Sequence, residues 1–267
     1  MLGTRILTAL VVIPIVICII IYGKVPGVYG LISAVIAVGL YEYLSFLYRT
    51  RINVQIIAHI MLGLLIPFVF FYRFPTYVPP TLAFILVSMV SFSLFNVSDP
   101  KKKVENLFIR IFGIFYVSFL LSFLIPLRAL PFGGDWVIIA LVINFGTDAG
   151  AYFAGRFLGK HKLYPAVSPK KTVEGAIGGV ALCTILLLGY RQFFFGELRL
   201  VHVLVLGVVG SMLAILGDLA ESLIKRGFEV KDAGVIVPGH GGILDRIDSF
   251  VFSVPFIYYY AALCFPA

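Results

Sequence analysis

Charged side chains are scarce in this chain of 267 residues. Only 13% of the residues are Asp, Glu, Lys or Arg, whereas 61% are hydrophobic. The mean hydropathy of +1.05 lies far outside the range of soluble domains. The composition therefore excludes an ordinary soluble fold and indicates a chain that is embedded in a lipid bilayer.

Cysteine is also rare, and its three copies, Cys18, Cys183 and Cys264, all fall within apolar stretches. None of them forms a CxxC pair, so neither a disulfide framework nor a cysteine metal site is expected. No small-residue cleavage site follows the first apolar stretch, which we interpret as a retained span rather than a secretion signal. Internal repeats and a low-complexity tail are absent as well.

About nine apolar stretches are long enough, or nearly so, to cross a bilayer, which takes about 20 residues of helix. Lipid offers the backbone no hydrogen-bond partner and no strand alternation is visible, so the spans should be helical. The predicted fold is all-α, a polytopic integral membrane protein with about nine transmembrane helices. The predicted spans are residues 5–23, 28–48, 55–72, 79–96, 107–129, 136–158, 175–194, 200–224 and 249–265.

Lysine and arginine are distributed unevenly between the two sides that this span pattern defines. With a cytoplasmic N-terminus, sixteen of the 21 basic residues fall inside and five fall outside. The positive-inside rule therefore predicts a cytoplasmic N-terminus and an external C-terminus. The net charge of +8 follows from this bias and suits anionic membrane lipids, so no nucleic-acid partner is expected.

The chain divides by chemistry at about residue 135. Residues 1–135 hold about five plain spans, in which Glu42 is the only acid, and we interpret them as a membrane scaffold. Residues 136–267 hold about four spans with acids and glycines, and two long basic cytoplasmic loops, 159–175 and 225–248. Charge beside lipid is costly, so we expect this second half to be catalytic.

Acids within the predicted spans are the first candidates for a site. Asp148 shares one helix face with Asn144 and Tyr152, because the three are four residues apart. An acid at this depth is a functional candidate by default, although packing specificity is an alternative. Glycine spacings around Asp148, at positions 146, 150, 155 and 159, should let a neighbouring helix approach closely.

A second polar face runs along the span 200–224 and beyond. Asp218, Glu221, Ser222 and Lys225 line it from membrane depth to the cytoplasmic edge, which Arg226 shares. An ion pair between Glu221 and Lys225 is a purely structural alternative for these two residues. It does not explain Asp218, which has no basic residue one turn away.

The start of the last span adds Asp245 and Asp248, three residues apart. One helical turn should direct both carboxylates the same way, whereas Arg246 between them points elsewhere. Opposite Asp218, the two acids would form an oxygen-rich cage suited to Mg²⁺.

Glycines at positions 239, 241 and 242 precede this last helix and could hold a phosphate at its N-terminus. His240 among them is ambiguous between loop hydrogen bonding and phosphate contact. In the other loop, Lys170 and Lys171 could bind a polyphosphate. Alternatively, the two lysines only mark a cytoplasmic loop that ends in a capping Thr172. Because the loop 225–248 is also rich in charged residues, we favour phosphate binding.

Three segments closely resemble those of the phosphatidate cytidylyltransferases, or CDP-diacylglycerol synthases. The longest reads SxIKRxxxxKDxGxxVPGHGGILDRID, and DAGAYFAGRxxGKHKL and SPKKTVEGxxGG precede it. The resemblance covers about residues 144–250, and the first half is similar only as generic membrane helices. Val237 replaces a usual leucine or isoleucine, which is a conservative change.

The resemblance implies a nucleotidyltransferase that transfers CMP from CTP to phosphatidic acid, giving CDP-diacylglycerol and pyrophosphate, in phospholipid biosynthesis. It also implies a divalent cation, Mg²⁺, with or without a second cation. On this interpretation Asp218, Asp245 and Asp248 hold the metal, and the same three act in catalysis with Lys225. The predicted substrate-binding residues are Lys170, Lys171, Ser222, Arg226, His240, Gly241, Arg246 and Asp148.

The predicted location is the cell membrane, with the active site on the cytoplasmic side. Another CTP-dependent membrane enzyme, acting on an isoprenoid alcohol or an archaeal lipid, is an alternative. An ion-coupled transporter is a weaker one, because it needs an acid-lined route across the membrane and these groups crowd one side. The oligomeric state is left open, with a homodimer as one alternative.

Overall fold

The computed structural model describes residues 14–48, 54–73, 75–95, 99–231, 233–234 and 241–265. Within these residues the backbone is mainly helical, and the sheet consists of one two-stranded hairpin. Seven helices are long and apolar enough to cross a membrane. The prediction of an all-α polytopic membrane protein is confirmed at this level.

The seven candidate spans coincide with seven of the predicted ones. They are Lys24–Tyr48, Val54–Tyr72, Pro100–Ala129, Gly133–Leu158, Val173–Phe193, Leu200–Gly227 and Leu244–Cys264. The predicted span 79–96 is helix α4, Val78–Leu94, which has only 17 residues. Residues 5–13 of the predicted span 5–23 lie outside the described residues, and residues 14–22 are helical. Nine spans and the orientation of the termini stay predictions.

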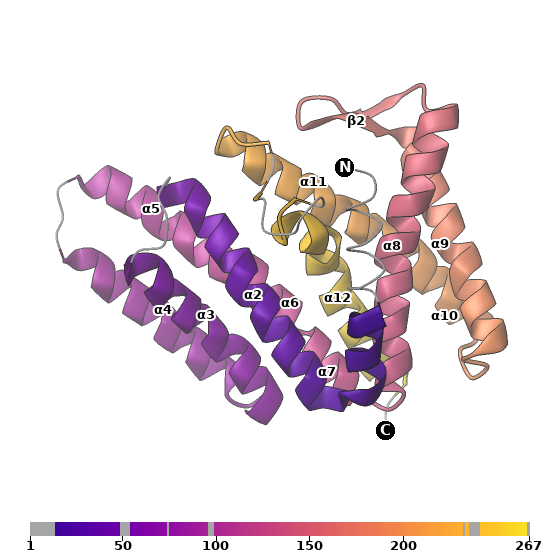
Figure 1. The fold of residues 1–267 in the computed structure, drawn as a ribbon, viewed down its shortest axis with the longest axis horizontal. Helices are drawn as coiled ribbons and strands as arrows, with labels where there is room; N and C mark the ends of the chain where they lie inside the picture. Colours follow the sequence, from indigo (N-terminus) through magenta and orange to yellow (C-terminus); the bar gives the residue numbers. More distant parts are fainter. Residues whose placement is uncertain are drawn as a thin grey trace. The chain divides into compact units, whose positions relative to one another are not determined.

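The chain folds into two compact units, of which the first comprises Met1–Ala129 and Asp232–Leu244. In this unit α2 packs against α3 and α3 packs against α4, as Figure 1 shows. Apolar side chains of these helices, such as Ile36, Leu40 and Ile66, are buried. Its helices are α2 Lys24–Tyr48, α3 Val54–Arg73, α4 Val78–Leu94, α5 Pro100–Gly113, a π-helical segment Ile114–Phe119, α6 Leu120–Ser122 and α7 Leu124–Ala129.

Helix α5 begins earlier than the predicted span at 107–129. The Asp99 carboxylate accepts hydrogen bonds from the backbone N–H groups of Lys101, at 3.1 Å, and Lys102, at 3.4 Å. Pro100 occupies the first turn, where its missing N–H costs nothing. This cap starts the helix at Pro100, so Lys101, Lys102 and Lys103 lie in its first turn and a half.

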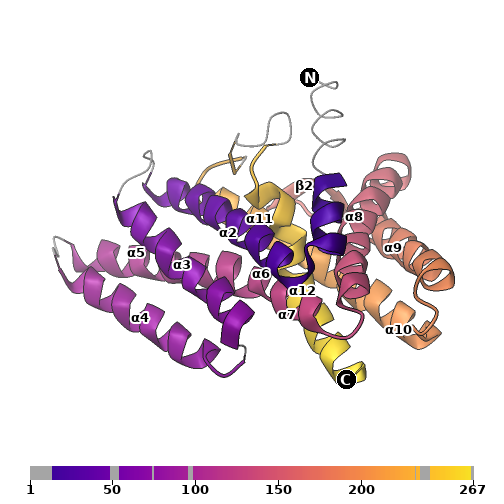
Figure 2. The same cartoon turned by 60° about the horizontal axis from the view of Figure 1, so that its bottom comes forward.

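The second unit comprises Leu130–Lys231 and Asp245–Ala267. Helices α8 and α9 pack along their lengths, and both views show them side by side (Figures 1 and 2). Its elements are α8 Gly133–Leu158, β1 Lys162–Tyr164, β2 Ser168–Thr172, α9 Val173–Phe193, α10 Leu200–Val205, a π-helical segment Leu206–Gly210, α11 Ser211–Gly227 and α12, which runs Leu244–Cys264.

Glycines allow the close contact between α8 and α9. A Cβ atom on Gly150 would lie 2.5 Å from the backbone oxygen of Gly178 and 2.9 Å from the Cα of Gly179. The backbones therefore touch where side chains would hold them apart. This is the close helix approach that the glycine spacing predicted.

The cytoplasmic loop predicted at 159–175 contains a β-hairpin. Strands β1 and β2 pair antiparallel, with Lys162 opposite Thr172 and Tyr164 opposite Ser168. Thr172 then caps α9, since its Oγ1 accepts a hydrogen bond from the Gly175 N–H at 3.1 Å. The hairpin therefore leads directly into α9, and the paired lysines lie in a strand rather than in a free loop.

The division between the units falls near residue 130, close to the point where the charge pattern changes. The segment Asp232–Leu244 was not expected in the first unit, because it follows the division in the sequence. The scaffold and catalytic roles of the two halves, 1–135 and 136–267, stay predictions.

Candidate active site

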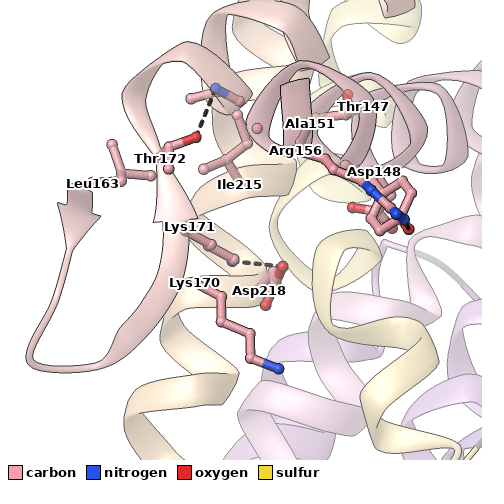
Figure 3. A pocket seen from close by; sticks show the side chains of 14 residues that line it. Thr147, Asp148, Ala151, Arg156, Leu163, Lys170, Lys171, Thr172, Ile215 and Asp218 are labelled. Carbon is pink, nitrogen blue, oxygen red and sulfur yellow. Dashed lines mark hydrogen bonds and ion pairs between the residues drawn. The ribbon is translucent and has the colours of Figure 1, made fainter. Parts of the chain in front are cut away.

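A cavity of about 540 Å³ lies within the second unit. Helices α8, α9 and α11 and the hairpin line it, and its wall carries acids and bases together (Figure 3). Such a mixture suits a ligand that carries both phosphates and a cation. The polar lining residues are Thr147, Asp148, Tyr152, Arg156, Lys170, Lys171, Thr172 and Asp218.

Lys171 and Asp218 form an ion pair in this cavity. Lys171 Nζ of β2 lies 2.5 Å from Asp218 Oδ2 of α11, and Figure 3 shows the two side chains directed at each other. Their side chains are 24% and 29% exposed, so water screens the pair only in part. The basic partner that Asp218 lacks on its own helix therefore comes from the hairpin.

Lys225 lies between two carboxylates. Its Nζ is 2.6 Å from Asp245 Oδ1 on α12 and also pairs with Glu221, one turn earlier on α11. Glu221 is fully buried, and its charge needs this partner. The Glu221–Lys225 pair considered from the sequence is present, and Lys225 also joins α11 to α12.

Three aspartates of three different helices lie near one another. Asp148 of α8, Asp218 of α11 and Asp248 of α12 are close enough to interact electrostatically. Gly217 permits this arrangement, because a Cβ atom there would clash with the backbone oxygen of Asp248. Neighbouring carboxylates repel, and a cation relieves the repulsion.

The acids do not form a finished metal cage. Among the described residues, no three His, Cys, Asp or Glu side chains have the arrangement of a metal site. Asp248 Oδ1 accepts hydrogen bonds from the Ser249 N–H at 2.6 Å and the Ser249 hydroxyl at 3.1 Å. Asp245 and Asp218 are each engaged by a lysine. A cation would have to draw these groups from their present partners.

Three further predicted residues do not line the cavity themselves. The Ser222 hydroxyl is 3.5 Å from Asp218 Oδ1, and Arg226 Nε is 3.5 Å from the backbone oxygen of Val167. Arg246 is exposed and interacts electrostatically with Asp148. Arg226 thus supports the hairpin, and the substrate-binding roles of all three stay predictions.

The glycine-rich segment before α12 is described only in part. Gly239 and His240 lie outside the described residues. Gly241 has a φ of 90°, a backbone conformation that glycine adopts without strain. Gly242 is buried. The predicted contact of Gly241 and His240 with substrate stays a prediction.

Arg156 is a charged lining residue that was not singled out from the sequence. Its Nη1 donates a hydrogen bond to Tyr152 Oη at 2.8 Å, and both lie on the α8 face that carries Asp148. Arg156 follows Tyr152 by four residues, so it continues the series Asn144, Asp148 and Tyr152 on the same helix face. Asn144, at the other end of that stripe, is buried and donates to Ser253 Oγ at 2.9 Å.

Comparison with known proteins identifies the family of the chain. Residues 3–264 match the cytidylyltransferase family. The chain belongs to this family. The resemblance noted in three C-terminal segments is therefore confirmed, and the family match extends it over the N-terminal half.

Curated relatives carry the name phosphatidate cytidylyltransferase. One from Bacillus subtilis is 42% identical over 149 residues, which is 55% of this chain and 55% of the relative. One from Staphylococcus epidermidis is 49% identical over 126 residues, 47% of this chain and 48% of the relative. One from Staphylococcus aureus is 46% identical over 125 residues. The chain thus spans about half the length of the curated relatives it matches.

Proposed function

We propose that this member of the family is a phosphatidate cytidylyltransferase, which transfers CMP from CTP to phosphatidic acid. The names of its relatives support this activity. The observation that carries the proposal is the cavity, where Lys171 pairs with Asp218 beside Asp148, Lys170 and Arg156. Bases for phosphates and acids for a cation occur there together, as the reaction requires.

The reaction is an in-line substitution at phosphorus. A phosphate oxygen of phosphatidic acid attacks the α-phosphorus of CTP, a new P–O bond forms, and the bond to the β-phosphate breaks as pyrophosphate leaves. The attacking phosphate is already anionic near neutral pH, so no strong general base is needed. Catalysis then consists of positioning and charge neutralisation. Lys170, Lys171, Lys225 and Arg156 are the cationic groups suited to the phosphates.

The acids of the site fit a hard divalent cation such as Mg²⁺. We assign it to Asp218, Asp245 and Asp248, with Asp148 close by. Mg²⁺ usually takes one or two carboxylates and completes its shell with water and substrate phosphates, so a three-residue cage is not required. When bound, the cation neutralises charge on the phosphoryl group in transfer. The proposal needs one such cation, with or without a second.

Substrate binding would exchange the ion pairs of the site. Lys171 pairs with Asp218 and Lys225 with Asp245 in the structure. A complex of CTP with a divalent cation carries charges of both signs, so the aspartates can turn to the cation and the lysines to the phosphates. Asp218, Asp245 and the two lysines would each exchange one charged partner for another, which limits the desolvation cost.

We place the site on the cytoplasmic side of the cell membrane. The predicted excess of basic residues on that side supports this, as does the restriction of CTP to water. Phosphatidic acid would arrive sideways, with its acyl chains in the inner leaflet and its phosphate in the cavity.

One assay tests the activity. Purified protein in lipid vesicles is given CTP and Mg²⁺, and both pyrophosphate and CDP-diacylglycerol are measured. We expect both products only when phosphatidic acid is present, and loss of both when EDTA is added. Arms in which a polyprenol or diacylglycerol replaces phosphatidic acid address the alternative acceptors. Pyrophosphate release with a polyprenol or with diacylglycerol, and none with phosphatidic acid, would overturn the proposal.

A further inference from the structure

Glu42 of α2 is a buried acid that the proposed reaction does not use. Its side chain is 1% exposed, and it belongs to the candidate span Lys24–Tyr48. An ionisable group inside a membrane segment costs free energy unless a partner compensates for it. The groups that contact Glu42 should therefore show what this buried acid does in the structure.

Glu42 contacts the segment that leads into α12. Its Oε2 accepts a hydrogen bond from the backbone N–H of Leu244 at 2.8 Å. Two glycines close around the carboxyl group, because a Cβ atom on Gly234 would lie 2.5 Å from Oε1 and one on Gly242 would lie 2.7 Å from Oε2. All four residues belong to the first unit. The glycines thus form a cradle that has no room for a side chain.

Leu244 is the first residue of α12. The N–H groups of a first helical turn have no acceptor within their own helix, and an acidic side chain there is favoured by the helix dipole. The acceptor normally comes from the residue just before the helix. Here it comes from α2, 202 residues away in the sequence. Glu42 therefore supplies the acceptor for the first N–H group of α12.

Asp245 follows Leu244 directly and lies in the same helical turn. Because the two residues are covalently joined, a shift of the Leu244 backbone moves the Asp245 side chain. That side chain meets Lys225 at 2.6 Å, so its direction matters for the site. A change at Glu42 that displaces Leu244 would therefore displace Asp245 as well.

We propose that Glu42 is a positioning residue for the cytidylyl transfer, which sets the start of α12 and hence the direction of Asp245. It acts through Leu244 and touches no substrate. The catalytic consequence rests on the proposed function, whereas the hydrogen bond to Leu244 does not.

Three variants separate positioning from charge. Glu42→Gln keeps an acceptor oxygen at the same distance from the backbone. Glu42→Asp keeps the charge, but its side chain is shorter by one methylene. Glu42→Ala removes both the acceptor oxygen and the charge. We expect kcat within about threefold of wild type for the first, because its acceptor is retained. For the other two we expect kcat to fall about a hundredfold with little change in the KM for CTP, the effect of a misplacement of about 1 Å. An active Glu42→Asp with an inactive Glu42→Gln would overturn the proposal.

Hydrogen exchange gives a readout that does not depend on activity. We expect the peptide that contains Leu244 to exchange faster in Glu42→Ala and Glu42→Asp than in wild type. Tyr43→Phe is the matched control, because Tyr43 is a buried neighbour on α2 whose hydroxyl donates to the Ile109 backbone oxygen at 3.0 Å instead. It should leave this peptide unchanged. Unchanged exchange in Glu42→Ala would refute the positioning role even if activity fell.

Gly234→Ala tests the same contact from the other side, and it serves if Glu42→Ala fails to fold. Its new Cβ must displace the Glu42 carboxyl group, so it should lower kcat and speed exchange at Leu244. Gly227→Ala is the control, since nothing lies within 4 Å of a Cβ there. Absence of transferase activity in the wild-type protein would refute the proposed function. Hydrogen exchange at Leu244 would still decide whether Glu42 positions the start of α12.

Discussion

At the scale of single residues, two lysines of the candidate site pair with its carboxylates. Lys171 holds Asp218, and Lys225 holds Asp245 together with the buried Glu221. Removing one partner leaves the other charged group without compensation in a poorly hydrated place. Single substitutions here should therefore have large effects on turnover while leaving the membrane helices intact.

Asp218→Asn should abolish turnover. Loss of a carboxylate that binds a metal removes several kcal/mol of transition-state stabilisation, which is roughly a thousandfold in kcat. The measurement is CDP-diacylglycerol formation by the purified variant at saturating Mg²⁺. Asp135→Asn is a matched control, because Asp135 accepts a hydrogen bond from Tyr190 and does not line the cavity. If Asp218→Asn kept more than about a tenth of the wild-type kcat, the metal assignment would be wrong.

Lys171→Gln and Lys170→Gln should weaken the binding of CTP. A charge-assisted contact to phosphate is worth about 1.5–3 kcal/mol, so the KM for CTP should rise by about tenfold or more. Initial rates over a range of CTP concentrations measure this. Lys162→Gln, on the neighbouring strand and outside the cavity lining, is the control and should keep the wild-type KM. Equal KM values for all three variants would retire the phosphate role.

At the scale of elements, the contact between α8 and α9 positions the cavity. Asp148 and Arg156 lie on α8, and the hairpin leads into α9, so the separation of these helices sets the width of the site. Glycines keep that separation small. In lipid, such close packing replaces the hydrophobic effect as the source of helix association.

Gly150→Ala should destabilise the protein. The added Cβ would lie 2.5 Å from the Gly178 oxygen and 2.8 Å from the Leu182 Cβ, so the helices must separate. Overpacking of this kind costs about 1–3 kcal/mol. Thermal unfolding in detergent should show a lower midpoint for this variant. Gly189→Ala on α9 meets nothing within 4 Å and should match or exceed wild type, and a lowered midpoint there would count against the packing argument.

At the scale of the whole molecule, the predicted orientation decides which substrates can reach the site. Lys162 belongs to a predicted cytoplasmic loop and Glu197 to a predicted external one, and both side chains are exposed. The native cysteines are first replaced by alanine, and then a single cysteine is placed at either position. Intact cells treated with an impermeant maleimide should label Glu197→Cys at once and Lys162→Cys only after permeabilisation. The opposite pattern would overturn the topology and the access of CTP.

The residue pattern alone identified the membrane helices and the half of the chain with the candidate site. Long apolar stretches must be helical in lipid, and this holds whatever they pack against. The polar faces of α8 and α11 also follow from local spacing, since residues four apart share a face. For the same reason the Glu221–Lys225 pair could be anticipated, as could the cap at Thr172.

Tertiary structure decided which of these faces meet. Lys171 reaches Asp218 because the loop folds into a hairpin, and strand pairing over so few residues leaves little trace in the sequence. Lys225 joins α11 to Asp245 across a long loop. Glu42 holds the N–H of Leu244 from the other end of the chain, and no spacing rule connects residues that far apart. Local periodicity fixes which residues share a helix face, whereas only the packing of distant segments fixes which charges neutralise one another.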